Sequence, residues 1–472
     1  MFNLIETVNN LVWGAPLVIL CLGAGVYFTL RTKFVQLRFL VEMPRLLFGS
    51  KETDKGVSSF QAFALAVSGH VGTGNIAGVA MAIFYGGPGS IFWMWAMAIL
   101  CSASSFVETT LGQIYKKEIN GEYRGGPAFY IDKGLGMRWF AILFAVVSVI
   151  SIGLFLPMVQ SANIADAVST AFRIDRFIVG IIIMVFLGAV IFGGSRRLVH
   201  IAEVIVPFMA VSYLIITILV ILLNIQELPR VIQLIIDSAF KRDAVFGGIA
   251  GSAISLGVKR GIFSNEAGLG SVPNLTASSD VSHPVKQGLV SAFCVYIDTI
   301  FICTSTAFMI LITGKFNVAN PEGGFLYEGL PGVTRYSEYT QESISAVLNN
   351  FGPLFVAISL IFFGFTTFMA YYYQAETNLL YLFDRNKKLT FFINVLRVST
   401  LVSVLISTIY TSEFAWKVGD IGVGIIAWLN IIAILLLHKL SLHALKDYEK
   451  QKKEGNDPVY KAKYLKNVEC WK

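Results

Sequence analysis

The chain has 472 residues, of which 55% are hydrophobic and only 14% are charged. A soluble protein of this length would carry nearer to about a quarter of charged residues, so the composition excludes that class and predicts a polytopic membrane protein. The formal net charge of +7 does not indicate a nucleic-acid partner, because the basic residues gather at the ends of apolar segments, where membrane topology explains them.

A membrane-spanning helix needs about 20 predominantly apolar residues. On that rule the sequence predicts an all-α protein with eleven transmembrane helices, at approximately 11–30, 59–86, 88–113, 139–165, 177–195, 201–223, 245–278, 284–312, 353–383, 389–410 and 414–438. The first segment follows Glu6 and no basic residue, so we expect a retained helix; the alternative is a cleaved leader.

The distribution of lysine and arginine predicts the orientation in the membrane. The segments on one side of the predicted helices carry 26 of these residues, whereas those on the opposite side carry eight. Cytoplasmic loops carry the excess of basic residues, so we expect the N-terminus outside and the C-terminus inside.

Two of the predicted helices, 59–86 and 245–278, are interrupted by glycine-rich polar stretches. An unwound backbone in a bilayer leaves NH and CO groups without partners, so such a break is expected only where it lines a cavity or holds a ligand. Without the first helix, the other ten divide into two sets of five, each led by a broken helix and crossing in opposite directions. This pattern predicts an inverted-repeat transporter with a binding site near the membrane midplane.

The predicted organisation follows from these breaks. It comprises an extra N-terminal helix with a basic cytoplasmic connection (1–58), a first five-helix repeat (59–226), a second five-helix repeat (227–440) and a cytoplasmic tail (441–472). The external stretch 313–352 is rich in glycine and proline and then predicts a short amphipathic helix from Ser337 to Asn349. This stretch is either a lid-like loop helix or a long surface loop.

The first break runs from Gly69 to Asn75, and we expect one half-helix to end near Ser68 and the next to begin near Asn75. Free backbone NH groups at a helix start suit a small anion such as a carboxylate. A glycine-rich face for helix packing is the alternative. The predicted carboxylate end of the substrate site consists of Gly72, Thr73, Gly74 and Asn75.

The second break runs from Gly261 to Gly268. Carbonyl groups at the end of the preceding half-helix are expected to accept hydrogen bonds from an ammonium group, because a helix C-terminus has the opposite polarity. A carboxylate site that faces an ammonium site predicts a small zwitterion as the substrate. The predicted ammonium end consists of Ile262, Phe263, Ser264 and Asn265, in which Phe263 either walls off the substrate side chain or simply packs.

Two long motifs resemble the alanine or glycine:cation symporter family, also described as the sodium:alanine symporter family: residues 71–80 (VGTGNIAGVA) and 260–271 (RGIFSNEAGLGS). Shorter stretches that fit the same family are 125–127, 134–136, 298–299 and 365–367. The resemblance covers nearly the whole chain. It implies the bacterial leucine-transporter fold with one extra N-terminal helix, and a secondary transporter in the cytoplasmic membrane of a prokaryote. The implied function is symport of alanine or glycine with Na⁺ by alternating access.

The same fold implies a sodium site between the first broken helix and the eighth core helix. The implied ligands are the carbonyls of Ser68, Val71 and Phe363 and the hydroxyls of Thr366 and Thr367. The alternative for the two threonines is that they bond only to their own helix.

Four further residues are candidates for coupling or gating. His70 stands where the family pattern leads us to expect a smaller hydroxyl residue or an arginine, and it either carries a coupled proton or remains a neutral, hydrogen-bonded histidine. Glu266, Arg260 and Asp298 lie in or near predicted spans, where ionisable groups are usually paired or functional. We expect an ion pair or a cytoplasmic gate for them rather than substrate binding.

No phosphate-binding loop motif is present in the sequence, so we expect an ion gradient to drive transport, with Na⁺ as the coupling ion and no other cofactor. The expected partners are the amino acid, Na⁺ and the lipid bilayer, while the oligomeric state stays open. A proton-coupled transporter is the first alternative. An ion channel is the second, although channel filters repeat the same element and the two breaks here differ from each other. A membrane-embedded enzyme would need a nucleophile and base, which no motif supplies.

Overall fold

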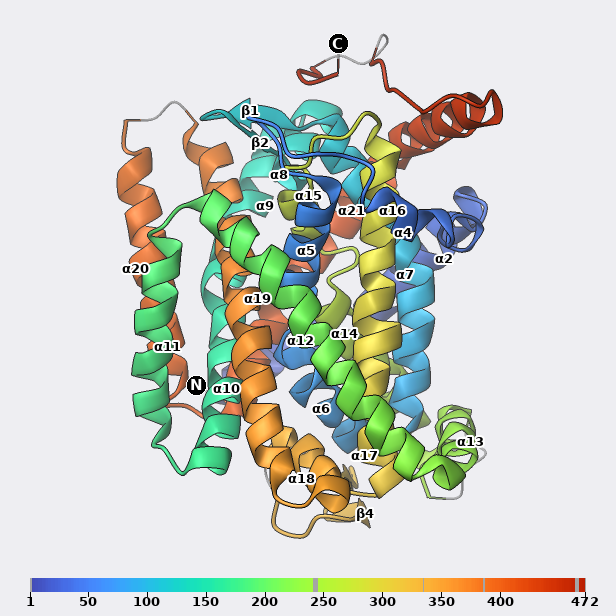
Figure 1. The fold of residues 1–472 in the computed structure, drawn as a ribbon, viewed down its shortest axis with the longest axis vertical. Coiled ribbons are helices and arrows are strands. Elements are labelled where there is room, and N and C mark those ends of the chain that lie inside the picture. Colours follow the sequence, from blue (N-terminus) through green and yellow to red (C-terminus); the bar gives the residue numbers. More distant parts are fainter. Residues whose placement is uncertain (1, 241–244, 334, 385–386, 463–466, 472) are drawn as a thin grey trace.

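The computed structural model describes residues 2–240, 245–333, 335–384, 387–462 and 467–471. It is a bundle of helices that run mostly along one common direction (Figure 1). The basic residues at 241, 242, 385, 463, 466 and 472, which the predicted topology includes, lie outside the described part.

The helices up to the second break are α1 (Phe2–Val12), α2 (Ala15–Arg31), α3 (Val35–Arg38), α4 (Glu42–Leu46), α5 (Ser59–His70), α6 (Ala77–Gly86), α7 (Gly89–Ile114), α8 (Pro127–Tyr130), α9 (Arg138–Ile150), α10 (Leu156–Phe172), α11 (Arg176–Ile191), α12 (Ser195–Leu223), α13 (Leu228–Ala239) and α14 (Ala250–Asn265). The later helices are α15 (Ser271–Thr276), α16 (Pro284–Val295), α17 (Thr304–Thr313), α18 (Tyr336–Leu348), α19 (Phe351–Phe383), α20 (Leu389–Ser407) and α21 (Ser412–Lys453). The strands are β1 (Lys117–Ile119), β2 (Glu122–Arg124), β3 (Asn317–Ala319) and β4 (Phe325–Glu328), which form two antiparallel hairpins.

Eight described helical stretches are long and apolar enough to cross a membrane, and the bent pair α5 and α6 adds a ninth. The apolar helix α11 has only 16 residues, and α14 is separated from α15 by the second break. The predicted class, an all-α polytopic membrane protein, is therefore confirmed, whereas the predicted count of eleven spans is not. The last helix also differs from the prediction, because α21 continues well beyond residue 438 to Lys453.

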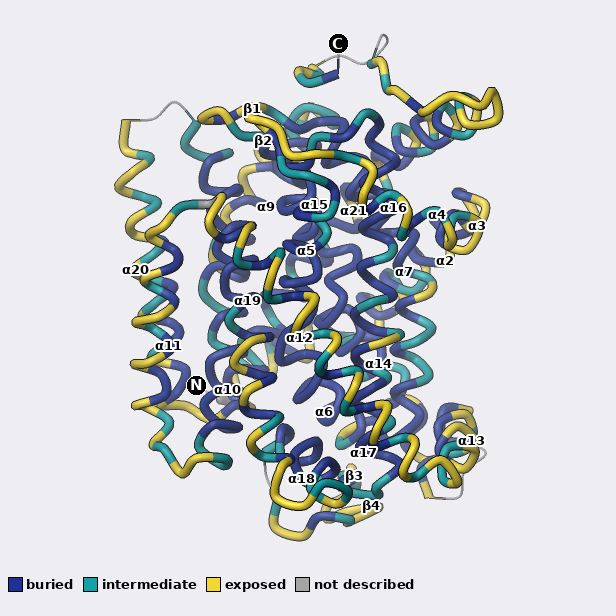
Figure 2. The backbone as a smooth tube through the Cα atoms, viewed as in Figure 1, coloured by how far each residue is buried: buried dark blue, intermediate teal, exposed yellow. Residues whose placement is uncertain are grey.

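Burial separates a central group of helices from a lipid-facing shell (Figure 2). Nearly all residues of α5, α6 and α15 are buried. The peripheral helices instead expose large apolar side chains, such as Phe186 at 63% and Val204 at 72%. This inverted pattern is expected where hydrocarbon rather than water surrounds the protein. The two broken helices therefore lie in the protein interior, where irregular backbone is tolerated.

The stretch after α17, which the topology predicts to be external, folds into the β3–β4 hairpin and α18. The predicted amphipathic helix, 337–349, matches α18 to within one residue at each end. Its inner face is buried, and the hydroxyls of Tyr336 and Tyr85 lie 3.1 Å apart, which connects α18 to α6. The stretch is thus packed against the ends of the core helices instead of forming an open loop.

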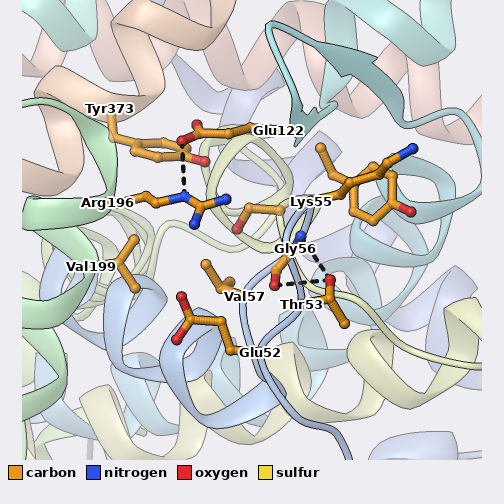
Figure 3. Close-up of a pocket in the computed structure, with 11 residues that line it drawn as sticks. Glu52, Thr53, Lys55, Gly56, Val57, Glu122, Arg196, Val199 and Tyr373 are labelled. Atoms are coloured by element: carbon orange, nitrogen blue, oxygen red, sulfur yellow. Dashed lines mark hydrogen bonds and ion pairs between the residues drawn. The ribbon is translucent and has the colours of Figure 1, made fainter.

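The opposite end of the broken helices is tied together by backbone hydrogen bonds. The amide of Val57, just before α5, donates to the Ser278 carbonyl (3.0 Å), and the Asp280 amide donates to the Val57 carbonyl (2.9 Å). The cavity beside this crossing is only about 20 Å³, room for about one water molecule. Figure 3 shows Arg196 directed toward Glu122 across it, at 3.6 Å. The segment before α5 and the segment after α15 are therefore in close contact at this end of the bundle.

The C-terminal tail lies over the same end (Figure 1). The amide of Tyr460 donates to the Ser282 carbonyl (2.9 Å), and the indole of Trp471 donates to the Gln113 carbonyl (2.8 Å). Lys286 and Asp457 form an ion pair of 2.5 Å. The tail therefore holds the segment that follows α15 and the end of α7.

His283 connects this segment to α21 and predicts a pH dependence. Its Nδ1 accepts the Val285 amide (3.1 Å) and caps α16, while its Nε2 faces Asp447 (3.4 Å). Burial lowers the pKa of His283 to about 4, below its ordinary value of about 6.5. The folded state thus favours the neutral ring, so this stabilisation is complete above pH about 6.5 and is lost as the pH falls toward 4.

We expect the melting temperature of the purified protein to fall more steeply between pH 6.5 and 4 than that of His283→Asn, which keeps a capping acceptor but does not titrate. His443→Asn, at an exposed position of α21, is the matched control and should keep the wild-type slope. Equal slopes for wild type and His283→Asn would contradict the assignment.

Candidate functional site at the two helix breaks

The first break is a sharp bend of 56° between α5 and the turn that leads into α6. A 3₁₀ turn, Thr73–Asn75, fills the gap, and the Asn75 side chain accepts the Gly72 amide at 2.8 Å. The first half-helix thus ends at His70 rather than near Ser68, and the second begins at Ala77 rather than at Asn75. Asn75 stabilises the break from inside the turn.

Besides Gly72, two of the four residues predicted for the carboxylate end, Thr73 and Asn75, have backbone amides that already donate hydrogen bonds. The Thr73 amide donates to Gln160 Oε1 of α10 (2.9 Å), and the Asn75 amide donates to the Gly72 carbonyl (3.3 Å). The prediction of a row of free amides is therefore wrong for these two residues, because a side chain and a tight turn satisfy them. The Thr73 hydroxyl, in contrast, is buried and has no hydrogen-bond partner in the described part of the chain. A buried polar atom of this kind is costly unless a ligand or water meets it.

The second break lies later than predicted. Helix α14 continues to Asn265, and the chain then turns at Glu266, Gly268 and Gly270, all with positive φ. The backbone carbonyls from Gly261 to Phe263, at the end that was predicted to accept hydrogen bonds from an ammonium group, therefore lie inside a helix. The Glu266 amide donates a hydrogen bond to the Ile262 carbonyl at 2.9 Å. Local left-handed conformations, which the sequence spacing did not reveal, set the end of this helix.

A buried carboxylate of α7 organises the second break. Glu108 accepts the amides of Gly268 (3.1 Å) and Gly270 (2.9 Å) and the side-chain amide of Asn430 on α21 (2.7 Å). Neither Glu108 nor Asn430 is among the predicted site residues, because residues so far apart in the chain give no local signal. Among the described residues Glu266 forms no ion pair with Lys259 or Arg260 of α14. It instead accepts the Ser271 hydroxyl at 2.6 Å.

Asp298 joins the two breaks. It lies in a π-helical segment, Tyr296–Cys303, a local geometry that often occurs at functional positions. One carboxylate oxygen accepts Asn75 Nδ2 at 2.5 Å and the Ser264 hydroxyl at 3.0 Å. The other accepts Thr299, whose hydroxyl also accepts Asn265 Nδ2 at 3.1 Å. The predicted residues Asn75, Ser264, Asn265 and Asp298 are thus brought together, through Thr299, which was not predicted.

Gly74 faces the second broken helix at close range. A Cβ atom at Gly74 would lie 3.4 Å from both the Phe263 ring and the Ser264 Cα. Phe263 in turn packs on Trp416 of α21, with ring centroids 4.6 Å apart. The predicted wall residue Phe263 is therefore beside the break, and Trp416 is a second aromatic residue that the sequence did not single out.

Arg260 pairs with Asp420 of α21, and so does Lys259, at 2.8 Å. The predicted ion pair is present, but it lies where α21 begins, at the end of the bundle opposite the C-terminal tail. Under the predicted orientation this is the external side, so the expectation of a cytoplasmic gate does not fit Arg260.

Of the five predicted sodium ligands, Val71, Phe363 and Thr367 come together between α5 and α19. The Thr367 hydroxyl lies 3.3 Å from the Val71 carbonyl and 2.8 Å from the Phe363 carbonyl. The Thr366 hydroxyl contacts carbonyls of its own helix, Phe362 and Phe363. The Ser68 hydroxyl donates to Leu65 within α5, and among the described residues no hydrogen bond connects Ser68 to α19.

His70 ends α5 in a buried position, with 2% of its surface exposed. Neither ring nitrogen has a partner at hydrogen-bond geometry among the described residues, although the backbone of Cys294 interacts with the ring. Both alternatives, a proton carrier and a neutral, hydrogen-bonded histidine, therefore stay predictions. The ring is buried beside the break without forming part of the Asp298 network.

Comparisons with known proteins identify relatives of nearly the whole chain. The putative sodium/proton-dependent alanine carrier protein YrbD of Bacillus subtilis is 51% identical over 100% of this chain and 98% of its own length. The probable sodium/glutamine symporter GlnT of the same organism is 44% identical over 99% of this chain and 96% of its length. The crystal structure of the Eremococcus coleocola manganese transporter with a bound aromatic bis-isothiourea compound superposes with a TM-score of 0.53, at 14% identity, covering 84% of this chain and 88% of that one.

The structural likeness concerns the fold alone, and it confirms the leucine-transporter type of architecture expected from the sequence. The family described as the sodium:alanine symporter family matches residues 1–462, which is nearly the whole chain. Its members are membrane transporters rather than enzymes. This chain therefore belongs to the sodium:alanine symporter family.

Proposed function

We propose that this secondary transporter carries a small neutral amino acid, alanine or glycine, into the cell together with Na⁺. The two breaks pack closely, since a methyl group added at Gly74 would already be in van der Waals contact with the Phe263 ring, at 3.4 Å. The Thr73 hydroxyl, which has no hydrogen-bond partner among the described residues, offers a polar contact there, and the Asp298 carboxyl group accepts Asn75 Nδ2 two positions further along the chain. Relatives are named for alanine and for glutamine, so the short distance at Gly74 is the observation that favours the smaller substrate.

The proposed architecture places the two broken helices at the head of two inverted repeats, 59–226 and 227–440, with the N-terminus outside and the C-terminus inside. Alternating access would then open the site in turn to each side. The buried contacts of α5 with α19, and of the turn Thr73–Asn75 with both α14 and α19, support a site at the centre of the bundle. Uptake of radiolabelled alanine, glycine and glutamine into proteoliposomes, with and without a sodium gradient, tests the proposal. Faster uptake of glutamine than of alanine would overturn the assignment of the substrate.

The geometry around Thr367 supports sodium as the coupling ion. Its hydroxyl has one proton for two carbonyls, and the shorter distance, 2.8 Å, favours donation to Phe363. Its lone pairs then face the Val71 carbonyl at 3.3 Å. Two oxygens that face each other without a proton repel unless a cation lies between them, and hard cations prefer such oxygen ligands.

We expect Thr367→Ala to raise the sodium concentration needed for half-maximal uptake while changing the maximal rate much less. Loss of one charge-assisted contact is worth about 1.5–3 kcal/mol, or about 10- to 150-fold in affinity. Thr366→Ala should have a smaller effect, because its hydroxyl bonds within α19. An unchanged sodium dependence in both variants would move the ion to another place or favour protons.

Proton coupling through His70 is the competing proposal. If sodium drives uptake, His70→Thr should retain sodium-dependent transport, because the ring has no hydrogen bond to any predicted sodium ligand among the described residues. If His70 carries the coupled ion, an inward proton gradient in sodium-free proteoliposomes should drive uptake, and His70→Thr should abolish it. We expect the first result, and the second would replace sodium by protons.

A further inference from the structure

An open cleft of about 650 Å³ lies at the end of the bundle that carries β1, β2, α8 and the C-terminal tail (Figure 1). The first turns of α9, the last turn of α19, strand β1 and the segment from Phe129 to Lys133 line it, and we call it the α9–α19 cleft. One helical stretch long enough to cross the membrane starts there at Arg138, and another ends there at Phe383. Trp139 is 63% exposed, as is typical of tryptophan at the membrane surface. The cleft therefore lies where the hydrocarbon meets the lipid headgroups.

One face of α9 joins a cation to an apolar track. Arg138, Ile142 and Val146 all line the cleft, and their spacing of four residues places them on the same side of the helix. At a rise of about 1.5 Å per residue, Ile142 lies about 6 Å and Val146 about 12 Å along the axis from Arg138. Ile142 and Val146 are each 41% exposed. An apolar chain can therefore lie against this face while a polar group attached to it reaches Arg138.

The opposite wall of the cleft is held in place by contacts between distant segments. The Tyr381 ring of α19 packs on the ring of Phe129, with centroids 5.2 Å apart. Its hydroxyl interacts with Asp132, and Arg138 is close enough to Tyr381 to interact with it electrostatically. Both helices pack against each other beside the cleft. The cleft is thus a built feature of the fold between α9 and α19.

The lysines of the cleft already have anionic partners. Lys117 pairs with Asp384 at 2.6 Å, which connects β1 to the end of α19. Lys133 pairs with Glu469 of the tail, also at 2.6 Å.

Arg138, in contrast, has no ion pair or hydrogen bond to a side chain within the ranges that the structure describes. The two carboxylates that line the cleft, Asp132 and Asp384, are engaged by Tyr381 and Lys117. The unmatched group at the head of the apolar track is therefore a cation.

These features together describe a ligand. A guanidinium binds a phosphate through two parallel hydrogen bonds, and basic clefts between helices at the membrane surface favour anionic headgroups. The apolar track on α9 suits an acyl chain, for which a soluble phosphate has no counterpart. A zwitterionic headgroup would bring an ammonium group beside Lys117 and Lys133, whose carboxylate partners are already engaged.

We propose that the α9–α19 cleft binds one anionic glycerophospholipid, with its phosphate on Arg138 and an acyl chain along Ile142 and Val146. Such a lipid contacts α9 and α19 at once, and α19 is the helix that carries Thr367. The proposal concerns the lipid partner and is independent of which amino acid and which ion are carried.

Native mass spectrometry of the purified protein in a neutral detergent tests this proposal. Titration with phosphatidylglycerol should show one molecule retained per chain at concentrations where phosphatidylcholine with the same chains is not retained. Diacylglycerol, which lacks the phosphate, and glycerol 3-phosphate, which lacks the chains, should each bind at least about tenfold more weakly. Glycerol 3-phosphate that bound as tightly as the lipid would overturn the proposal in favour of a soluble phosphate.

Two pairs of variants locate the lipid. Arg138→Gln should weaken retention of phosphatidylglycerol about tenfold, whereas Arg173→Gln, at an exposed arginine that follows the other end of the same span, should not. Ile142→Trp fills the track and should also weaken retention. Leu143→Trp is its matched control, since Leu143 is 42% exposed but lies outside the lining of the cleft.

Arg138 and Ile142 are both exposed, so neither change opens the protein interior. Equal retention of phosphatidylglycerol and phosphatidylcholine would overturn the proposal, and so would equal losses in Arg138→Gln and Arg173→Gln. Wild-type retention in both Arg138→Gln and Ile142→Trp would likewise contradict it and leave only a general lipid shell.

Discussion

Replacement of Gly72 by alanine should lower sodium-dependent uptake by about 100-fold or more. A Cβ atom at this position would lie 2.7 Å from the Thr367 hydroxyl and 2.9 Å from Gln160 Oε1. It would therefore displace both the proposed sodium ligand and the acceptor of the Thr73 amide. Loss of two such contacts corresponds to about 3 kcal/mol, which is a little over two powers of ten. Initial rates of uptake in proteoliposomes, measured over a range of sodium concentrations, give the result.

Gly69→Ala is the matched control, since it adds the same methyl group to the same broken helix. Its Cβ would lie 3.4 Å from the Ala370 side chain, which is an ordinary contact. We expect uptake within about twofold of wild type for this variant, because surface and tolerated substitutions cost roughly 0.5 kcal/mol or less. Wild-type sodium dependence in Gly72→Ala would show that the close approach of α5 to α19 is not needed for coupling.

Glu108→Ala should destabilise the folded protein severely. It would leave the amides of Gly268 and Gly270 and the Asn430 side chain without their acceptor, in a region that water does not reach. Each unsatisfied buried donor costs about 1–3 kcal/mol, so the total is about 3–6 kcal/mol even after partial relaxation. The expected result is a large drop in the melting temperature, measured by size-exclusion chromatography after heating in detergent.

Glu108→Gln retains one acceptor oxygen and should fall between wild type and Glu108→Ala. Glu118→Ala removes a carboxylate from the exposed β1–β2 hairpin and should leave the melting temperature almost unchanged, because exposed ion pairs contribute little. If Glu108→Ala melted at the temperature of Glu118→Ala, the second break would have to find its acceptors elsewhere.

The sequence predicted the features that depend on local composition. The first break was recognised because glycine and polar residues interrupt an apolar helix, and α18 was placed to within one residue from its amphipathic pattern. Asn75 and Ser264 were predicted at the two ends of the substrate site and Asp298 as a coupling or gating residue, and hydrogen bonds to Asp298 connect them in the structure. In the two breaks and at Asp298, a polar residue within an apolar predicted helix already suggested a functional position.

The remaining features depend on packing between distant segments. Gln160 satisfies the Thr73 amide from 87 positions away, and no local pattern marks it. Glu108 and Asn430 shape the second break from two other helices, which is one reason that α14 extends beyond the predicted break. The cavity between α1, α6, α14 and α21 is lined by side chains from all four helices, so it could be found only in three dimensions.

The length of α21 has a mechanical consequence. An α-helix of 42 residues extends about 63 Å, roughly twice the hydrocarbon thickness of a bilayer. Three residues lie along this one continuous helix: Asp420 beside Arg260, Asn430 at the second break and Asp447 beside His283. No break in the helix is available to absorb a displacement of one end. A displacement of α21 near Asp420 would therefore also displace the C-terminal end of the helix, from which the tail continues.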